Sequence, residues 1–222
     1  MSPSGTSELT DRSMGPLATP SSSATPAACV GVDAVGLLDY LAQFCYQASA
    51  DGAKWQPDCV WPELELCVVG KEETRGHTKY VVQGMLRPAS SPALAWKVRR
   101  RLTSLRNGLH DPVRAALGSA AYASHFGRTP FAHRGGLPGT TARLDAWCRA
   151  LARCVGTGQL PPRALADVLS MLEAPNRAHW LREVAFGGAA LGRAPEVFRT
   201  DRGVVLAAVR ATGDALRFAA PA

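Results

Sequence analysis

The sequence predicts an α+β fold, in which a three-stranded antiparallel sheet packs against a helical subdomain and a short C-terminal α-helical repeat follows. Three patterns predict it. Hydrophobic residues alternate with polar ones between residues 62 and 99, recur every three or four positions in later segments, and form a repeat in the last fifty residues. The chain has 222 residues, 46% of them hydrophobic, which is enough for a sizeable core.

Two segments precede the predicted sheet. Residues 1–28 are rich in Ser, Thr, Pro and Gly, and we expect a disordered tail because they bury too little apolar surface to offset their ordering entropy. Residues 33–48 carry Leu37, Leu41 and Phe44 at helical spacing, which predicts an amphipathic helix. A packing role is the main interpretation of this helix, and binding of a partner is the alternative.

The alternating segments predict a meander of three strands, over 62–70, 77–86 and 94–99. Three arginines, residues 99–101, end the third segment. Because neighbouring side chains of a strand point to opposite faces, we expect Arg99 and Arg101 on one face and Arg100 on the other. Three strands alone form a marginal sheet, so helices must cover its apolar face.

Helices are predicted after the sheet. Leucine and valine at intervals of four predict a helix over 103–117, begun by a Thr103 or Ser104 cap. Pro112 in its middle predicts either a bent helix or two short helices. Residues 120–139 contain several Gly and Pro residues and predict a long loop, which in a compact domain is more often functional than not. Two further helices are expected over 140–155 and 163–174.

The positive charge of the chain is concentrated in its middle. Residues 60–173 contain 16 Lys and Arg against 8 Asp and Glu, whereas the whole chain has a net charge of +7. Thirteen of those 16 are arginines, whose planar fork suits bidentate contacts with phosphate. Such a module favours nucleic acid, an acidic membrane surface or an acidic protein as partner. Few aromatics are interleaved with the arginines, which argues against nucleic acid.

Several classes are disfavoured by what the sequence lacks. It has no apolar run of 18 residues and no pattern of a secretion signal. Its six cysteines, at 29, 45, 59, 67, 148 and 154, form no Cys-x-x-Cys pair, so we expect reduced thiols rather than a metal site. No carboxylate pair or Ser/His/Asp order supports catalysis. We therefore expect neither an enzyme nor a cofactor.

Two motifs carry a family resemblance. The segment "WKVRRR", residues 96–101, with Leu109-His110 after it, is similar to a strand and helix that read W-x-V-x-x-R-Y-S-D-F followed by Leu-His. The later "ARLDAWCRALARC" is similar to a helix that reads R-x-x-x-L-x-x-Y-L-x-x-L. On these motifs, residues 59–173 resemble the phox-homology (PX) family of phosphoinositide-binding domains.

The resemblance implies a headgroup site at the end of the third strand. In the family, the arginine at the place of Arg101 grips the 3-phosphate of the lipid, and Arg100 is the neighbouring candidate. Leu102 stands where the family has the aromatic residue that stacks under the inositol ring. Thr140 stands where a helix arginine should hold the 4- and 5-hydroxyls, and Arg143, three residues later, is the expected substitute.

The long loop is implied to approach the bilayer. Arg128, in "GRTPF", takes the place of a Pro-Pro-Lys-like motif and would be the phosphate ligand of the loop. Phe126, Phe131 and Leu137 are the candidates for insertion into the membrane interface. The expected partners are a phosphoinositide headgroup, with phosphatidylinositol 3-phosphate as the named candidate, and an anionic membrane. The expected location is cytoplasmic, peripheral on endosomal or other phosphoinositide-bearing membranes.

The segment 176–222 contains an internal repeat. At an offset of 25, Leu181, Val184, Gly188 and Leu191 meet Leu206, Val209, Gly213 and Leu216. The second copy resembles a helical repeat of a family of unknown function, and repeats of this kind commonly bind proteins. The alternative to lipid recruitment is therefore a protein-interaction scaffold with a degenerate PX-like fold. Convergence of fewer than two of Arg101, Arg128 and Arg143 on one pocket would favour that scaffold.

Overall fold

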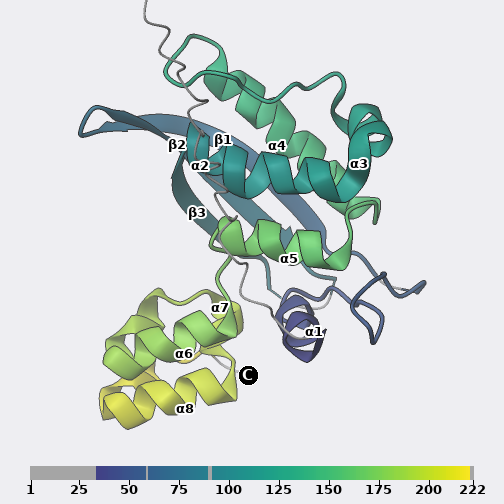
Figure 1. Cartoon of the computed structure of the whole chain (residues 1–222). Helices are drawn as coiled ribbons and strands as arrows, with labels where there is room; N and C mark the ends of the chain where they lie inside the picture. The colour runs from purple at the N-terminus through teal and green to yellow at the C-terminus, as the bar shows by residue number, and fades with distance from the viewer. Residues whose placement is uncertain (1–33, 59, 90–91, 221–222) are drawn as a thin grey trace, which may run out of the picture. The chain divides into compact units, whose positions relative to one another are not determined.

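A meander of three antiparallel strands forms the sheet in the order β1-β2-β3 (Figure 1). The computed structural model describes residues 34–58, 60–89 and 92–220. The strands are β1 (Glu63–Thr74), β2 (His77–Arg87) and β3 (Leu94–Arg101). Val82, in the centre of the sheet, lies opposite Val68 on one side and Val98 on the other.

The period-two pattern divides the sheet into a covered face and a solvent-exposed face. The covered face carries the buried Leu66, Val82 and Val98, and it is the face against which the helices pack. On β3, Lys97 and Arg99 are exposed on the opposite face. Alternation at the end of β3 therefore separates Arg99 from Arg100, as the sequence predicts.

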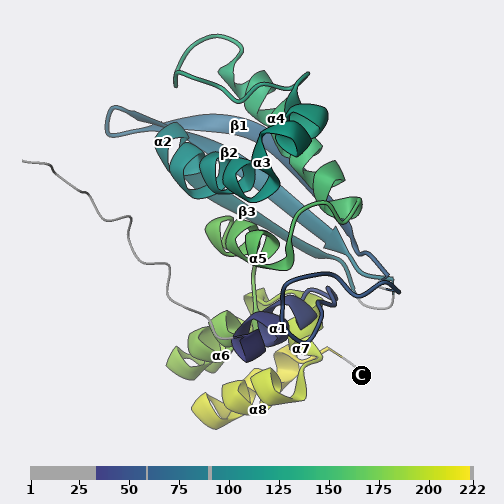
Figure 2. The same cartoon turned by 45° about the vertical axis from the view of Figure 1, so that its right-hand side comes forward.

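A nearly continuous helix follows β3, built from α2 (Leu102–Leu105), the π-helical turn η1 (Arg106–His110) and α3 (Asp111–Phe126). Figures 1 and 2 show this helix in front of the sheet. Neither Thr103 nor Ser104 caps it, because the residue before the first turn is Arg101. The prediction of a cap at those two residues is wrong.

Neither the bend nor the break predicted at Pro112 is present. Pro112 lies in the first turn of α3, directly after the π-helical turn, and the backbone is helical on both sides of it. The kink is at Gly118, whose φ of 72° is left-handed. Helix then continues to Phe126, so the long loop spans 127–139 rather than 120–139. It crosses the top of Figure 1.

Two more helices complete the core, α4 (Thr140–Gly156) and α5 (Pro162–Met171). Helix α4 packs along β1, where the Asp145 carboxylate accepts a hydrogen bond from the Val68 N–H at 2.9 Å. Because β1 is an edge strand, this bond satisfies a backbone donor that the sheet leaves unpaired. The indole of Trp147, in α4, is fully buried and donates to the Tyr122 hydroxyl at 3.0 Å.

The N-terminal helix α1 (Ala34–Ala42) is shorter than the predicted 33–48. A turn over residues 43–45 follows the helix, and Cys45 in it has a positive φ of 63°. Leu41 and Phe44 are buried, as expected for a packing helix. The predicted tail, 1–28, lies outside the described residues. The four described cysteines, Cys45, Cys67, Cys148 and Cys154, carry free thiols.

The C-terminal elements come in two matching sets. Helix α6 (Arg177–Phe186) is followed by the 3-10 helix η2 (Gly188–Arg193), and α8 (Arg202–Ala211) by the 3-10 helix η3 (Gly213–Phe218). The short α7 (Glu196–Arg199) connects them. Each boundary in the second set lies 25 residues after its counterpart in the first. The fold is therefore α+β with a C-terminal helical region.

Candidate anion-binding site

The loop 127–139 is held against the domain by hydrogen bonds to two separate elements, η1 and β2. The Arg106 guanidinium, in η1, donates to the carbonyls of Ala132 at 2.9 Å and His133 at 2.7 Å. The hydroxyl of the buried Tyr80, in β2, accepts from the Gly136 N–H at 2.9 Å. These bonds fix the middle of the loop above the end of the sheet.

The loop lies directly on Leu102 and Tyr80. A β-carbon on Gly135 would lie 3.8 Å from the Cβ of Leu102 and 3.7 Å from the Tyr80 hydroxyl, which is ordinary van der Waals contact. Gly136 has a φ of 75°, in the left-handed region that glycine tolerates best. The Thr140 hydroxyl then ties the end of the loop to the Arg134 carbonyl at 3.0 Å.

A cavity of about 260 Å³ lies between this loop and the start of α4. Its basic groups are His133 and Arg134 from the loop and Arg143 from the first turn of the helix. Within the described part of the chain, no ion pair engages any of these three side chains. The remaining lining residues are Ala132, Leu137, Pro138 and Thr140. The arrangement can therefore receive a small anion.

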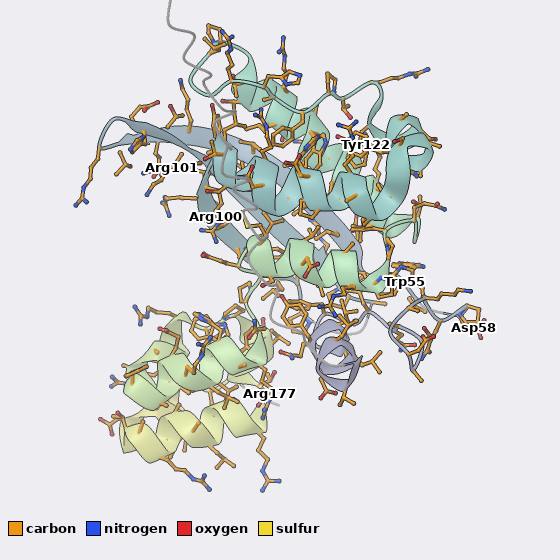
Figure 3. The ribbon with its side chains drawn as sticks, in the orientation of Figure 1. Trp55, Asp58, Arg100, Arg101, Tyr122 and Arg177 are labelled. Carbon is orange, nitrogen blue, oxygen red and sulfur yellow. The ribbon has the colours of Figure 1, made fainter. Side chains whose placement is uncertain are left out.

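The arginines at the end of β3 do not line this cavity. Arg100 is turned to the covered face, where its guanidinium donates to the Glu173 carboxylate and to the Met171 carbonyl at 3.3 Å. This contact with the end of α5 occupies the Arg100 guanidinium, and Arg100 does not line the cavity. Arg101 is exposed on the other side, and both lie where β3 meets α2 (Figure 3).

Arg101 is nevertheless next to a residue that contacts the loop of the cavity. Its neighbour Leu102 is buried beneath Gly135, one residue from the lining residue Arg134. Leu102 therefore supports the loop from below and does not face the cavity, which corrects its predicted place under a headgroup. Thr140 does line the cavity, at the position where the family resemblance implied an arginine.

Two of the three predicted insertion residues are wrong. Phe126 and Phe131 are only 1% and 6% exposed, because their rings pack on Trp147 with centroid separations of 5.2 Å each. Burial of such large apolar surface within the domain leaves nothing to insert into a bilayer. Leu137, in contrast, is 53% exposed at the rim of the cavity. Arg128 is exposed but outside the cavity lining.

Arg134 and His133 are the site residues that the sequence did not single out. The only local signal is the "AHRGGLPG" segment, where two basic residues precede a Gly-Gly pair. Its meaning depends on Arg106 and Tyr80, which hold the loop from 26 and 56 residues away.

A larger cavity of about 610 Å³ lies between β1 and α4. It is lined by both signs of charge, with Glu63 and Glu65 on the strand and Arg149 and Arg153 on the helix. The Arg149 guanidinium is already paired with Asp145 at 2.8 Å. This cavity therefore offers less to an anion than the smaller one does.

Over residues 34–58, 60–89 and 92–220, no helix is long and apolar enough to cross a membrane. Within the same residues, no cluster of three or more His, Cys, Asp or Glu side chains could hold a metal ion. Comparisons of the chain with models of known protein families, with curated proteins and with solved structures find no match.

Proposed function

We propose that the chain is a PX-like membrane-recruitment module that binds a phosphate-bearing lipid headgroup in the cavity of His133, Arg134 and Arg143. The observation that carries this proposal is the convergence of three basic side chains, from a loop and a helix, on one cavity without a carboxylate partner among the described residues. Arg134 and Arg143 are both cationic, and like charges that line one cavity repel one another, so an anion between them is stabilising.

The chemistry of the cavity suits a phosphate on a small ring. Arg134 and Arg143 each present a planar fork that can hold two phosphate oxygens, and His133 adds a donor in its protonated form. The cavity, about 260 Å³, is at the small end for ligand sites, which fits a headgroup better than a larger molecule. Because the Thr140 hydroxyl already donates to the Arg134 carbonyl, its role is to position the loop.

Membrane attraction would come from two further sources. Arg101, and Lys79 opposite it in the sheet register, add positive charge near the end of the domain. Each basic side chain near an anionic leaflet contributes about 1 kcal/mol. Leu137, half-exposed at the rim of the cavity, is the described apolar side chain that can enter the interface.

The predicted clamp is thus revised. Of Arg101, Arg128 and Arg143, only Arg143 lines the cavity. Fewer than two of these predicted arginines therefore converge on one pocket. Arg134 supplies the second arginine instead.

Liposome flotation tests this proposal. The chain is mixed with vesicles that carry one phosphoinositide, or the same total charge as phosphatidylserine, at a low and a high salt concentration. Arg134→Ala and Arg143→Ala are expected to abolish the preference for the phosphoinositide at both salt concentrations. Non-specific attraction between exposed charges fades with salt, whereas a headgroup held in a cavity is screened less.

Arg153→Ala is the matched control, because Arg153 lies on the same helix as Arg143, is exposed and is absent from the lining of this cavity. It removes the same charge and should lower only the salt-sensitive binding. Equal loss of phosphoinositide preference in the Arg153 and Arg143 variants would contradict the proposed site.

The second candidate is the protein-interaction scaffold. The shortfall of converging predicted arginines and the structural use of Arg100 against Glu173 favour it. It predicts that the chain floats equally with phosphoinositide and with phosphatidylserine vesicles, and that flotation disappears at high salt. The same flotation panel therefore separates the two candidates.

A further inference from the structure

The C-terminal repeat forms two units whose contact with each other can be followed residue by residue. The first unit is residues 176–194 and the second is residues 201–219, an offset of 25. In both, a side chain before the helix caps it: Asn176 accepts from the His179 N–H at 2.8 Å, and Asp201 accepts from the Val204 N–H at 2.9 Å. The two units are thus built alike.

The second unit lies closely on the first at a glycine. A β-carbon on Gly188 would clash with the Ala208 carbonyl oxygen and would lie only 2.9 Å from the Cβ of Ala215. Leu191, beside it in the first unit, is 0% exposed. Small side chains of the second unit therefore meet a glycine of the first, next to a leucine that is fully buried.

An ion pair joins the two units at the start of their helices. The Arg177 guanidinium, in the first turn of α6, donates to the capping carboxylate of Asp201 at 2.9 Å (Figure 3). One carboxylate thereby both caps α8 and binds the preceding unit. Burial would raise the pKa of Asp201, but hydrogen bonds from Arg177 and from the Val204 N–H outweigh it and hold the pKa below its usual value.

The second unit has a surface that corresponds to the contact surface of the first unit, and this surface is exposed. We call it the open face, and it consists of Arg202, Leu206, Val209, Gly213 and Leu216. Leu216, the counterpart of the buried Leu191, is 62% exposed, and Leu206 is 44% exposed. A β-carbon on Gly213 would meet no atom within 4 Å, and Gly213 is absent from the glycines with a positive φ. Neither packing nor backbone conformation within the described chain requires glycine there.

The arginine that pairs with the following unit is also repeated. Arg202 stands 25 residues after Arg177, is exposed, and forms no ion pair with the described residues. Next to the open face, Arg217 stands where the first unit has Gly192, and its guanidinium lies 4.7 Å from the centroid of the Phe218 ring. The open face thus keeps the glycine, the leucine and the arginine of the internal contact.

We propose that the open face binds a further repeat unit of the same build, distinct from the two units of residues 176–194 and 201–219. The internal contact specifies the chemistry of that unit: an aspartate that caps its helix opposite Arg202, and alanine-sized residues opposite Gly213 and Leu216. Burial of exposed apolar surface and pairing of an unpartnered arginine favour this docking.

A second copy of this chain is a poorer occupant. The surface with which a unit covers its predecessor includes Val204 and Ala208, both fully buried in the second unit. The first unit has His179 and Glu183 at these positions. Because a stacked copy would bury these polar groups without designed partners, head-to-tail stacking of copies is disfavoured.

The test uses the full chain and, as probe, a labelled peptide of residues 195–220, which carries Asp201, Ala208 and Ala215. Binding is followed by fluorescence anisotropy. Leu216→Glu in the full chain should weaken binding by at least about tenfold, because a carboxylate would be buried where the contact needs a leucine. Phe186→Ser is the matched control. Phe186 is 93% exposed but belongs to the first unit and not to the open face, so binding should not change.

A charge cycle examines the arginine separately. Arg202→Gln in the chain and Asp201→Asn in the peptide should each weaken binding by roughly threefold to tenfold, and together by no more than one of them alone. Asparagine is chosen because it still caps a helix. Additive effects would overturn the assigned pair.

A chain extended after residue 220 by a second copy of residues 196–220 guards against a peptide that does not fold alone. In this extended chain Leu216→Glu should lower the Tm by several degrees, while in the parent chain it should change little. The proposal is overturned if the peptide does not bind and the extended chain tolerates Leu216→Glu as well as the parent does. It is equally overturned if sedimentation shows that the chain self-associates through Leu216, since the occupant is then a second copy.

Discussion

The glycine pair of the C-terminal repeat allows a stability prediction with a built-in control. Gly188→Ala adds one methyl group where the Ala208 carbonyl and the Ala215 side chain already lie in contact distance, so the two units must separate. Overpacking of this kind costs about 1–3 kcal/mol. In a chain of this size each kcal/mol lowers the Tm by about 2–4 °C, which gives a loss of about 2–12 °C.

Gly213→Ala makes the same chemical change at the matching position of the second unit, where nothing lies within 4 Å. Because alanine restricts the unfolded chain more than glycine does, the expected result is no loss or a gain of about 0.4–1 kcal/mol. Thermal and urea unfolding of both variants, followed by circular dichroism, measure the difference. Equal Tm values for the two variants would refute the contact between the units and the openness of the second.

Three further predictions follow from other contacts. Arg106→Ala should speed proteolysis of the loop 127–139 and weaken headgroup binding by roughly threefold to tenfold, since the carbonyls of the loop lose their charged donor; unchanged protease resistance would count against this role. Because the folded pKa of Asp201 is lowered, its stabilisation is present above the unfolded pKa of about 3.9 and is lost as the pH falls through the folded pKa. The Tm advantage of the parent over Asp201→Asn should therefore shrink between about pH 6 and pH 2.5, and a constant advantage would contradict the assigned shift. Burial raises the pKa of Cys148 to about 12, so iodoacetamide at pH 8 should spare this thiol until the chain unfolds, and rapid labelling of the folded chain would contradict its burial.

The strands could be predicted from the sequence because one face of each is buried. Leu66, Val82 and Val98 alternate with polar residues, and the structure pairs the strands in the predicted meander. Alternating burial is a local pattern, so a strand can be recognised from it without knowledge of the partner strand. The helix over 140–155 was predictable for the same reason, with a period of 3.6 residues.

The site was less predictable because its position depends on distant contacts. Helix α3 continues beyond Gly118, although the local sequence suggests a loop, since Tyr122 and Phe126 pack on Trp147. In a Gly- and Pro-rich segment, local sequence does not distinguish a phenylalanine that is buried from one that is presented to solvent. Likewise, Arg134 became a site residue only through Arg106 and Tyr80, which place its loop over the sheet end.

Titration of the isotopically labelled chain with a soluble phosphoinositide headgroup, observed through backbone amide shifts, is the most direct test of the proposed headgroup site. Binding in the cavity should give saturable shifts clustered between residues 132 and 143, which disappear in the Arg143→Ala variant. Shifts confined to the end of β3, or no saturable shift at all, would contradict it.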